Sequence, residues 1–583
     1  MGVAIKVFIK YDAIFPEDEP KEIQEYFQGI SRETLLKVGA FFLGFKSNNS
    51  QYADPFSFLN MFFSKGNTDL VSKIAKNLLI HIKESNIEKN NYSFFNFSSS
   101  LSFFENVFDR AEDVEDSISK ELMEENIFKA YLHLNQFYSE KSLLATTSTE
   151  NLSTERLPAS MLLALQLHNF DIENYHLDKL FSTQLIRAIL FFEFLKSKEE
   201  CNALLIKFYE YFNVNDYKDY LKRLLPLTLS IIKGINEAQT DILIEKKSDS
   251  VFIDKLTIAI DDTIEDIDFK KIRANPLYKF DEGKYRIISP LFTIEMVFNG
   301  LFWKLKSIND SLPKKDKIKN FFDFKTYKFS EKFVLHRVLR EYFGNRYIQI
   351  DGDELDANYD GAPDYYLRNG KKIFLFESKD IILNANTKQS CDFNIIEKEL
   401  KLKLYKKEDG TPKAVLQLIN NIRKILLMQL GFDNNYKSKN VVIYPIIVVH
   451  NRMFNTGGLN KLLNFWMYEE LEILKDEGLN ISNVKPVVLI DIDTLLFHKD
   501  LFVSRKLSFE RCIIEYQKKF LNYNAKNKNF KSEEHMLQSA KNSFLPYSYF
   551  LYDKIDRARL RRTPSELMEK GYNLLVFLKK FHF

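Results

Sequence analysis

The spacing of apolar residues divides this 583-residue chain into two parts of different character. From about Ile23 to Glu245 apolar residues recur mostly every three or four positions, in segments such as ETLLKVGAFFLGF and QLIRAILFFEFLKS. This period matches one face of an α-helix, which turns once in about 3.6 residues. The sequence therefore predicts a large helical domain over residues 1–245.

Two further segments suggest boundaries. Residues 145–155 read ATTSTENLSTE, and a run rich in Ser and Thr is typical of a loop, here between two helical sub-bundles. Beyond residue 245, VFIDKLTIAIDD and KYRIISPLF contain the β-branched and aromatic residues of strands, whereas TIEMVFNGLFWKL returns to helical spacing. Residues 246–320 are accordingly predicted to form a mixed connector.

From Lys325 onward the pattern reads helix, three strands, helix, strand, helix and strand. The strand-like runs are RYIQI, PDYYLR, KKIFLFESK, NVVIYPIIVV and KPVVLIDID. This order predicts an α/β unit with a mixed central sheet over residues 321–500. Residues 501–583 show helical spacing again and are rich in Lys and Arg. The expected fold class is a multidomain α plus α/β protein with helical N-terminal and C-terminal regions.

Composition limits the function classes. Apolar residues make up 45% of the chain and charged residues 28%, as in ordinary globular proteins, which excludes wholesale disorder. The net charge is only +3, so the chain as a whole is not drawn to nucleic acid or to a membrane surface. Any surface that binds nucleic acid must be local.

Cysteine usage and apolar run lengths bear on location. The three cysteines are far apart in the sequence and form no CxxC pair, so neither a disulfide framework nor a zinc knuckle is indicated. The segment MGVAIKVFIKYDAIF is too short and too charged for a signal peptide or a membrane span. No other run has the uncharged length to cross a bilayer. We expect a cytoplasmic protein with no membrane partner.

The most informative segment is GAPDYYLRNGKKIFLFESKD, residues 361–380. An Asn-Gly pair at 369–370 between two strand-like runs is a strong hairpin signal, because both residues tolerate a positive φ. A two-residue loop at that pair places Arg368 opposite Lys371. The sequence thus predicts both the hairpin and its register.

This register predicts which side chains share a face. Asp364 is expected opposite Leu375, and the alternation of side chains puts Glu377 and Lys379 on the same side. Asp364 would then be a diagonal neighbour of Glu377, roughly 7–8 Å away between backbones. That distance lets both carboxylates reach one divalent cation. The opposite face can pack under a helix.

Charged residues at the end of an apolar strand are costly unless they have partners. The run IFLF is followed by Glu377 and, two positions later, by Lys379. A divalent cation would partner Asp364 and Glu377, because hard oxygen ligands suit Mg²⁺ and Mn²⁺. Lys379 could orient a water or offset charge developing on a phosphate.

These residues resemble the PD-(D/E)XK phosphodiesterase superfamily, which includes restriction endonucleases and recombination exonucleases. Pro363-Asp364, a β-turn, and Glu377-Ser378-Lys379 at the end of a hydrophobic strand carry the resemblance. It covers less than a third of the chain. It implies that Asp364, Glu377 and the Ser378 carbonyl bind Mg²⁺, with Mn²⁺ as a substitute, and that Lys379 assists the attacking water.

The resemblance also implies a fold and a function. Residues 321–500 would form a restriction-endonuclease-like core. The chain would be a metal-dependent nuclease that hydrolyses phosphodiester bonds of nucleic acid, with DNA favoured over RNA. By analogy with large accessory domains on such cores, it would serve prokaryotic restriction or anti-phage defence.

Members of this superfamily often carry a further acid on the helix before the first strand. Glu331 and Glu341 are the candidates, and Glu331 shares a helical stripe with Val334, which turns it toward the core side. Its alternative role is a favourable acid in the first helical turn. Gln417 occupies the place where some members carry a Gln that contacts the site. A solvated helix face is the alternative there.

A local basic run follows the predicted catalytic strand. Its candidates for nucleic-acid binding are Lys401, Lys403, Lys406 and Lys407. Such lysines would neutralise phosphates, so that binding falls steeply with salt. An ordinary solvated face is the alternative. Among nearby acids, Asp360 and Asp380 are interpreted as loop residues, with a second metal site as the alternative.

Three other interpretations stay open. The hairpin could be solvated, with a chance pair of Glu and Lys. The chain could be a non-catalytic nucleic-acid-binding or assembly protein built on a nuclease-like core. The helical half could bind a partner protein or a second copy of the chain. The sequence shows no P-loop and no HExxH, which speaks against a nucleotide-driven motor and a zinc hydrolase.

Overall fold

A computed structural model describes most of the chain. The described residues are 7–44, 54–85, 91–111, 113–173, 176–233, 241–259, 262–356, 359, 361–521, 544–561 and 563–575.

The first part of the chain is helical, as predicted. Its helices are α1 (Tyr11–Ile14), α2 (Ile23–Phe27), α3 (Arg32–Gly44), α4 (Pro55–Phe62), α5 (Thr68–Glu84), α6 (Phe97–Arg110), α7 (Lys120–Thr147), α8 (Leu157–Gln166), α9 (Phe170–Glu173), α10 (Leu177–Lys196), α11 (Asn202–Phe212) and α12 (Tyr217–Lys233). Two-residue strands β1 (Val7–Phe8) and β2 (Tyr92–Ser93) pair in parallel. The polar segment predicted to be a loop contains the end of α7 and the turns that lead to α8.

The region after α12 combines a small sheet with helices. Its elements are β3 (Asp241–Leu243), α13 (Lys247–Asp254), β4 (Thr257–Ile258), α14 (Lys270–Ala274), β5 (Leu277–Asp281), β6 (Lys284–Ile287), α15 (Pro290–Glu295), the π-helical η4 (Met296–Gly300) and α16 (Leu301–Ser311). The strands are ordered β3-β6-β5-β4. The strand-like VFID lies in helix α13, where Phe252 and Ile253 are buried.

The α/β unit follows the predicted order of elements. It comprises α17 (Phe321–Asp323), the π-helical η5 (Phe324–Leu335), α18 (His336–Phe343), β7 (Ile348–Asp351), α19 (Gly352–Asp356), β8 (Tyr365–Asn369), β9 (Lys372–Lys379), α20 (Ala385–Gln389), α21 (Phe393–Leu404), α22 (Ala414–Leu426), β10 (Val442–Val449), η8 (Arg452–Phe454), α23 (Leu459–Asp476), β11 (Val488–Asp491) and α24 (Ile492–Phe497). The sheet order is β11-β10-β9-β8-β7. Strands β9, β10 and β11 are parallel, and β7 and β8 are antiparallel to their neighbours. The expected mixed sheet is confirmed.

The predicted hairpin forms, but its register was wrong by two residues. Asn369 pairs with Lys372, so the loop is Gly370-Lys371 and not Asn369-Gly370. Gly370 takes the positive φ of the turn, at 57°. Continuing the ladder places Asp364, just before β8, opposite Glu377 and not opposite Leu375. A shift of two residues preserves the faces, so the two acids still share one side of the hairpin.

Both faces of the five-stranded sheet are covered. Phe374 and Phe376 pack into a core shared with α18 and the C-terminal helices, as the sequence predicts for the hairpin's second face. Ile373 and Leu375 pack on the opposite face, into a core shared with α22 and α23. Alternation of buried side chains to two apolar layers is typical of an interior strand in an α/β protein.

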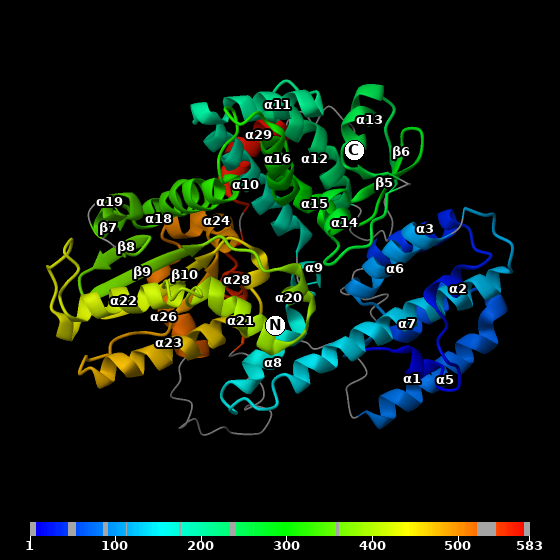
Figure 1. Ribbon diagram of the computed structural model, residues 1–583, viewed down its shortest axis with the longest axis horizontal. Helices are drawn as coiled ribbons and strands as arrows, with labels where there is room; N and C mark the ends of the chain where they lie inside the picture. The colour runs from blue at the N-terminus through cyan, green and yellow to red at the C-terminus, as the bar shows by residue number, and fades with distance from the viewer. Residues whose placement is uncertain are drawn as a thin grey trace.

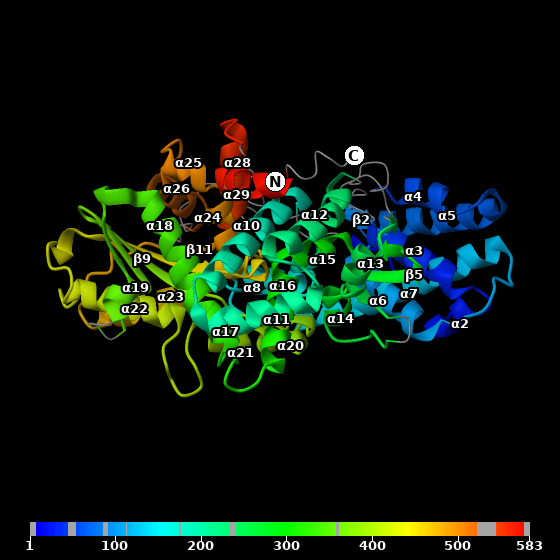
Figure 2. The same ribbon diagram turned by 90° about the horizontal axis from the view of Figure 1, so that it is seen from above.

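The described part of residues 501–583 is helical. It contains α25 (Lys499–Val503), α26 (Phe509–Tyr516), the π-helical η9 (Gln517–Leu521), α28 (Tyr547–Arg557) and α29 (Ser565–Leu575). Figures 1 and 2 show an elongated molecule with α1 to α7 at one end, the five-stranded sheet at the other, and α10, α12 and α16 between them. In the parts of the chain that the structure describes, no helix has both the length and the apolar character needed to cross a bilayer.

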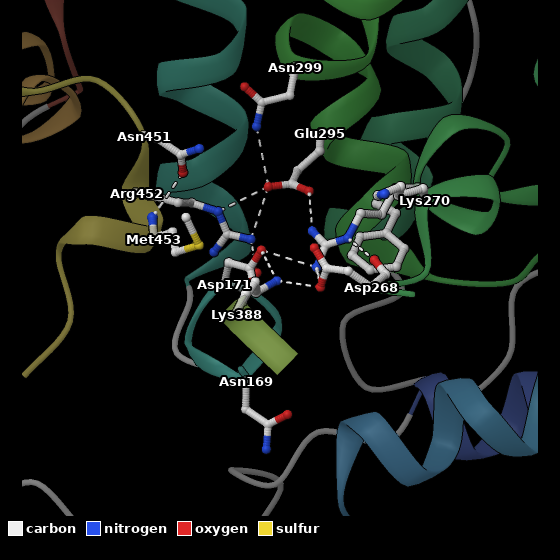
Figure 3. A network of polar contacts seen from close by, with 12 residues as sticks. Asn169, Asp171, Asp268, Lys270, Glu295, Asn299, Lys388, Asn451, Arg452 and Met453 are labelled. Carbon is white, nitrogen blue, oxygen red and sulfur yellow. Dashed lines mark hydrogen bonds and ion pairs between the residues drawn. The ribbon is translucent and has the colours of Figure 1, made fainter. Parts of the chain in front are cut away.

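A buried network of alternating charges lies where these parts meet (Figure 3). Its members are Asp171, Asp268, Arg273, Glu295, Lys388 and Arg452. The Lys388 ammonium is 2.8 Å from Asp171 and 2.6 Å from Asp268. Arg452 is 2.9 Å from Glu295. Three acids balance three bases, so no charge in the network is left uncompensated.

One acid of the helical region lacks such compensation. Glu105 on α6 is 3% exposed, and its Oε1 atom has no hydrogen-bond partner among the described residues. Burial, and then the negative charge of Asp266, raises the pKa of Glu105 from its ordinary value of 4.5 to about 9. The folded protein therefore holds this proton at neutral pH.

Glu105→Gln is expected to stabilise the protein at alkaline pH. Between pH 4.5 and about 9 the unfolded chain loses a proton that the folded chain keeps, so this residue's contribution falls as pH rises. Glutamine removes the titration. We expect the variant to exceed the parent in unfolding free energy at pH 8, by about 1 kcal/mol or more, and to match it near pH 4.5. Denaturant unfolding at the two pH values measures this.

Glu33→Gln is a suitable control, because the Glu33 side chain is 63% exposed and pairs with Lys37 on the surface of α3. An equal effect of Glu105→Gln at both pH values would contradict the prediction.

Candidate functional site

The candidate site lies at the carboxyl end of β9. Strands β9, β10 and β11 run in parallel, and Lys379, Val449 and Asp491 are in register across them. Their carboxyl ends therefore meet at one edge of the sheet, the edge where α/β proteins commonly bind ligands. Glu377, Ser378 and Lys379 are the last residues of β9.

The hairpin brings the predicted residues together. The Lys379 ammonium is 3.0 Å from Glu377 Oε2 and 3.6 Å from Asp364 Oδ2. The Ser378 backbone N–H donates a hydrogen bond of 2.6 Å to Asp364 Oδ2. Asp364 precedes β8, so this bond fixes its side chain against the neighbouring strand. Lys379 and Glu377 are both buried within the protein, at 13% and 0% side-chain exposure.

Glu331 joins this group, as the sequence predicted. It lies on η5, which packs against β9, and it is buried. Burial first, and then the negative charges of Asp364 and Glu377, raise the pKa of Glu331 to about 9 against the opposing effect of Lys379. Glu341, the less favoured candidate, lies elsewhere and pairs with Arg337 and Lys499.

The carboxyl group of Glu377 also has a raised pKa. Burial, followed by the charge of Asp364, raises the pKa of its carboxyl to about 8, against the opposing effect of Lys379. Its Oε1 atom is buried and accepts no hydrogen bond from any described residue. A buried carboxylate oxygen without a partner is expensive. A further cation at the site would therefore be favoured, because it would offset the negative charge of these carboxylates and contact the unpartnered Oε1 atom.

The donor set fits a hard divalent cation. Asp364 and Glu377 offer carboxylate oxygens, and the Oε1 atom of Glu377 has no hydrogen-bond partner among the described residues. The charges of both acids raise the pKa of Glu331. No three His, Cys, Asp or Glu side chains in the described ranges are already grouped as a metal site. Instead, the Lys379 ammonium contacts two of the acids.

A second buried layer lies behind these residues. Asp380 lies in the loop directly after β9, as interpreted from the sequence, and its carboxylate is 2.5 Å from both Lys325 Nζ and Ser330 Oγ. Burial would raise its pKa, but the charge of Lys325 helps to lower it to about 2. His450 Nε2 lies 2.9 Å from Ser378 Oγ. Asp380 is thus a structural partner of η5. Asp360 lies outside the described residues.

One basic residue near the predicted lysines was not expected. Lys413, at the N-terminus of α22, was not singled out from the sequence. Burial lowers the pKa of Lys413, and the positive charge of Lys407 lowers it further. Lys379 and Lys403 add repulsion of the same sign. An anion near Lys413 would relieve this repulsion. The sequence signal that could have identified Lys413 is its position one helical turn before Gln417.

The other predicted binding residues have different surroundings. Lys401 pairs with Glu397 at 3.2 Å and lies over the Trp466 ring. Lys406 lies over the Tyr405 ring and is exposed. Gln417 is on α22, which packs against β9, and its Oε1 atom is buried without a hydrogen-bond partner among the described residues. Gln417 is therefore a better placed candidate than Lys401 or Lys406.

Comparison with known proteins adds no family assignment. No protein-family model, no curated protein sequence and no solved structure matches this chain.

The pairing of Lys379 with Glu377 predicts a thermodynamic coupling. Lys379→Met leaves two buried acids without their shared cation, so we expect a loss of about 1–3 kcal/mol in unfolding free energy. The double variant Lys379→Met/Glu377→Gln should lose less than the sum of the single variants, because it removes both charges. Denaturant unfolding in EDTA gives the cycle. Additive single effects would show that the two side chains do not interact.

Proposed function

We propose that this chain is a metal-dependent nuclease of the PD-(D/E)XK type. The observation that carries the proposal is the convergence of Asp364, Glu377 and Lys379 with Glu331 at the carboxyl end of β9. Acids and a lysine that converge in a buried position with shifted pKa values are typical of catalytic sites. The mixed five-stranded sheet is compatible with a restriction-endonuclease-like core.

Asp364 and Glu377 would hold Mg²⁺ or Mn²⁺, together with Glu331 and the Ser378 carbonyl. Such a cation would supply Lewis-acid stabilisation of charge on the phosphate and lower the pKa of an attacking water. The Ser378 N–H keeps Asp364 oriented toward Glu377. Glu331, on η5, would add a third carboxylate to this group.

The chain's own residues have separable roles in this proposal. Lys379 orients the attacking water or offsets charge on the phosphate. Lys413, Lys403 and Lys407 bind the flanking phosphates, since their mutual repulsion is relieved by an anion. Gln417 offers a carbonyl oxygen that can accept a hydrogen bond from the substrate or from a water.

The biological setting belongs to the same proposal. DNA is the preferred substrate over RNA, in prokaryotic restriction or anti-phage defence. The helical region would recognise a trigger, a partner protein or a second copy of the chain. The three cysteines, Cys201, Cys391 and Cys512, are free and buried, which agrees with a reducing cytoplasm.

A second candidate is a non-catalytic nucleic-acid-binding or assembly protein on the same core. One observation favours it: the Lys379 ammonium is in ion-pair contact with both Asp364 and Glu377, the two acids that a metal ion would need. Titration calorimetry with Mn²⁺ separates the two candidates. Binding that Asp364→Ala abolishes favours the nuclease, whereas no binding in either protein favours the alternative.

Removal of the acidic ligands should abolish cleavage. We expect Glu377→Gln and Asp364→Asn each to lower the cleavage rate in Mg²⁺ at least about 100-fold, because charge stabilisation on the phosphate is lost. Lys379→Ala should do the same. Plasmid DNA, linear DNA, single-stranded DNA and RNA are incubated with Mg²⁺, Mn²⁺ or EDTA to measure the rates.

The matched control is Glu341→Gln, an acid that lies just after the same π-helical segment but pairs with Arg337 and Lys499. It should cleave like the parent. If Glu377→Gln or Lys379→Ala cuts as fast as the parent, the catalytic assignment is wrong.

The lysine cluster predicts a change in salt dependence. Replacement of Lys403, Lys407 and Lys413 by Gln should weaken binding across all sequences and reduce the slope of log affinity against log salt by about 1 for each lost contact. Fluorescence anisotropy in EDTA measures binding without cleavage. Lys314→Gln/Lys315→Gln, at two exposed lysines before the core, is the control and should leave the slope unchanged.

A further inference from the structure

A cavity of about 160 Å³ lies at the carboxyl end of β11, whose last residue, Asp491, forms part of its wall. The other walls come from α10, the segment after β10, α24 and α28. Helix α10 packs against α24, and α28 packs against β11. The cavity therefore lies where the helical region, the α/β unit and the C-terminal helices meet, at the sheet edge where α/β proteins commonly bind ligands.

The size and the walls of the cavity suit a small aliphatic group. A cavity of about 150 Å³ in another protein holds one benzene molecule, which has about six non-hydrogen atoms. Phe170 and Leu180 are buried and provide apolar wall. His176 is exposed, so the cavity reaches the protein surface on its side and a ligand slightly larger than benzene can extend there.

Two of the charged side chains at the cavity already have partners of opposite charge. Arg452 is 2.9 Å from Glu295, within the buried network. Asp493 is 3.3 Å from Arg187 of α10. Neither side chain therefore needs a ligand to balance its charge.

Two other charged side chains at the cavity lack such a partner. Neither Lys179 nor Asp491 has a side chain of opposite charge within ion-pair distance in the part of the chain that the structure describes. The Lys179 ammonium lies over the Tyr552 ring, 3.0 Å from its centroid. The Asp491 carboxylate accepts hydrogen bonds from the backbone N–H and the hydroxyl of Thr494. The cavity thus presents one uncompensated cation and one uncompensated anion.

Burial disfavours the charged forms of these two side chains. It lowers the pKa of Lys179 to about 8, and, together with the charge of Asp493, it raises the pKa of Asp491 to about 6. Both side chains are still mainly charged at pH 7. Burial also lowers the pKa of His176 and of His498, so the two histidines at the cavity are neutral at that pH. A ligand with one positive and one negative group would favour the charged forms of both Lys179 and Asp491.

We propose that this cavity binds a free α-amino acid with an aliphatic side chain. The ligand carboxylate contacts Lys179, its ammonium contacts Asp491, and its side chain packs against the apolar wall. Lys179 has three donors, so it can bind a carboxylate from its present position over Tyr552. Each oxygen of Asp491 has two lone pairs, so this carboxylate can accept a hydrogen bond from the ligand while it caps α24. The inference does not depend on the proposed nuclease function.

The full-length chain is titrated with L-valine, with isovalerate, which lacks the ammonium, and with isobutylamine, which lacks the carboxylate. Calorimetry should show L-valine binding at least about tenfold more tightly than either analogue, because each analogue leaves one charged side chain without its hydrogen bond. This comparison uses the parent chain and tests the inference even if a variant fails to fold.

Two variants assign the contacts. Lys179→Met should weaken L-valine binding about tenfold and abolish its advantage over isobutylamine. Asp491→Asn should weaken L-valine binding by a similar factor and abolish its advantage over isovalerate. Asparagine is as good a helix N-cap as aspartate, so this variant keeps the cap of α24.

Lys198→Met and Asp392→Asn are the matched controls. Lys198 follows α10 and lies over the Phe194 ring, and Asp392 caps α21, but neither residue lines the cavity. Both variants should bind L-valine like the parent.

The inference is overturned if L-valine does not bind at millimolar concentration, or if Lys179→Met and Asp491→Asn bind it like the parent. Isovalerate that binds as tightly as L-valine would overturn it in favour of a simple anion site, and isobutylamine that does so would overturn it in favour of an amine site. None of these outcomes bears on the nuclease, because cleavage in Mg²⁺ is measured separately.

Discussion

The buried charge network at the junction of the three regions is the constraint on which their arrangement depends. Asp171 comes from the helical region, Arg273 from the connector and Lys388 from the α/β unit, and both bases contact Asp171. Removing one member would leave the network with one uncompensated charge, at a cost of about 3–5 kcal/mol. Apolar packing alone tolerates sliding, whereas a balanced set of ion pairs has one favourable alignment. The network therefore fixes where the helical region meets the sheet.

This alignment brings α10 to the carboxyl edge of the sheet. Arg187 of α10 pairs with Asp493 at 3.3 Å and lies over the Phe298 ring, 4.2 Å from its centroid. Lys179, two turns earlier on the same helix, lines a cavity of about 160 Å³ together with Asp491, the last residue of β11. The helical region thus packs against the edge at which β11 ends.

The sequence was sufficient to predict most helices and strands, but not the contacts between segments that are far apart in the chain. The alternation of IFLF predicted both faces of β9, because period-two burial is a local property. The register differs by two residues, and Tyr366 and Arg368 on the first strand both hydrogen-bond to Asp433, more than sixty residues later, a contact that a local pattern cannot reveal. The sequence placed Asp380 in a loop, which is where it lies, but could not reveal its partners Lys325 and Ser330. Both come from η5, which only the folded chain brings near.

One electrostatic rule governs the candidate site. Burial disfavours the ionised form of an acid, and a cation within a few ångströms opposes that effect. Lys379 contacts both Asp364 and Glu377 and opposes the effect of burial only in part, because the pKa of the Glu377 carboxyl is still raised to about 8. Under the proposed function, a cation held by Asp364 and Glu377 would take the place of this ammonium. Lys379 would then be free to turn toward a phosphate, so occupation of the two acids and availability of the lysine would be linked.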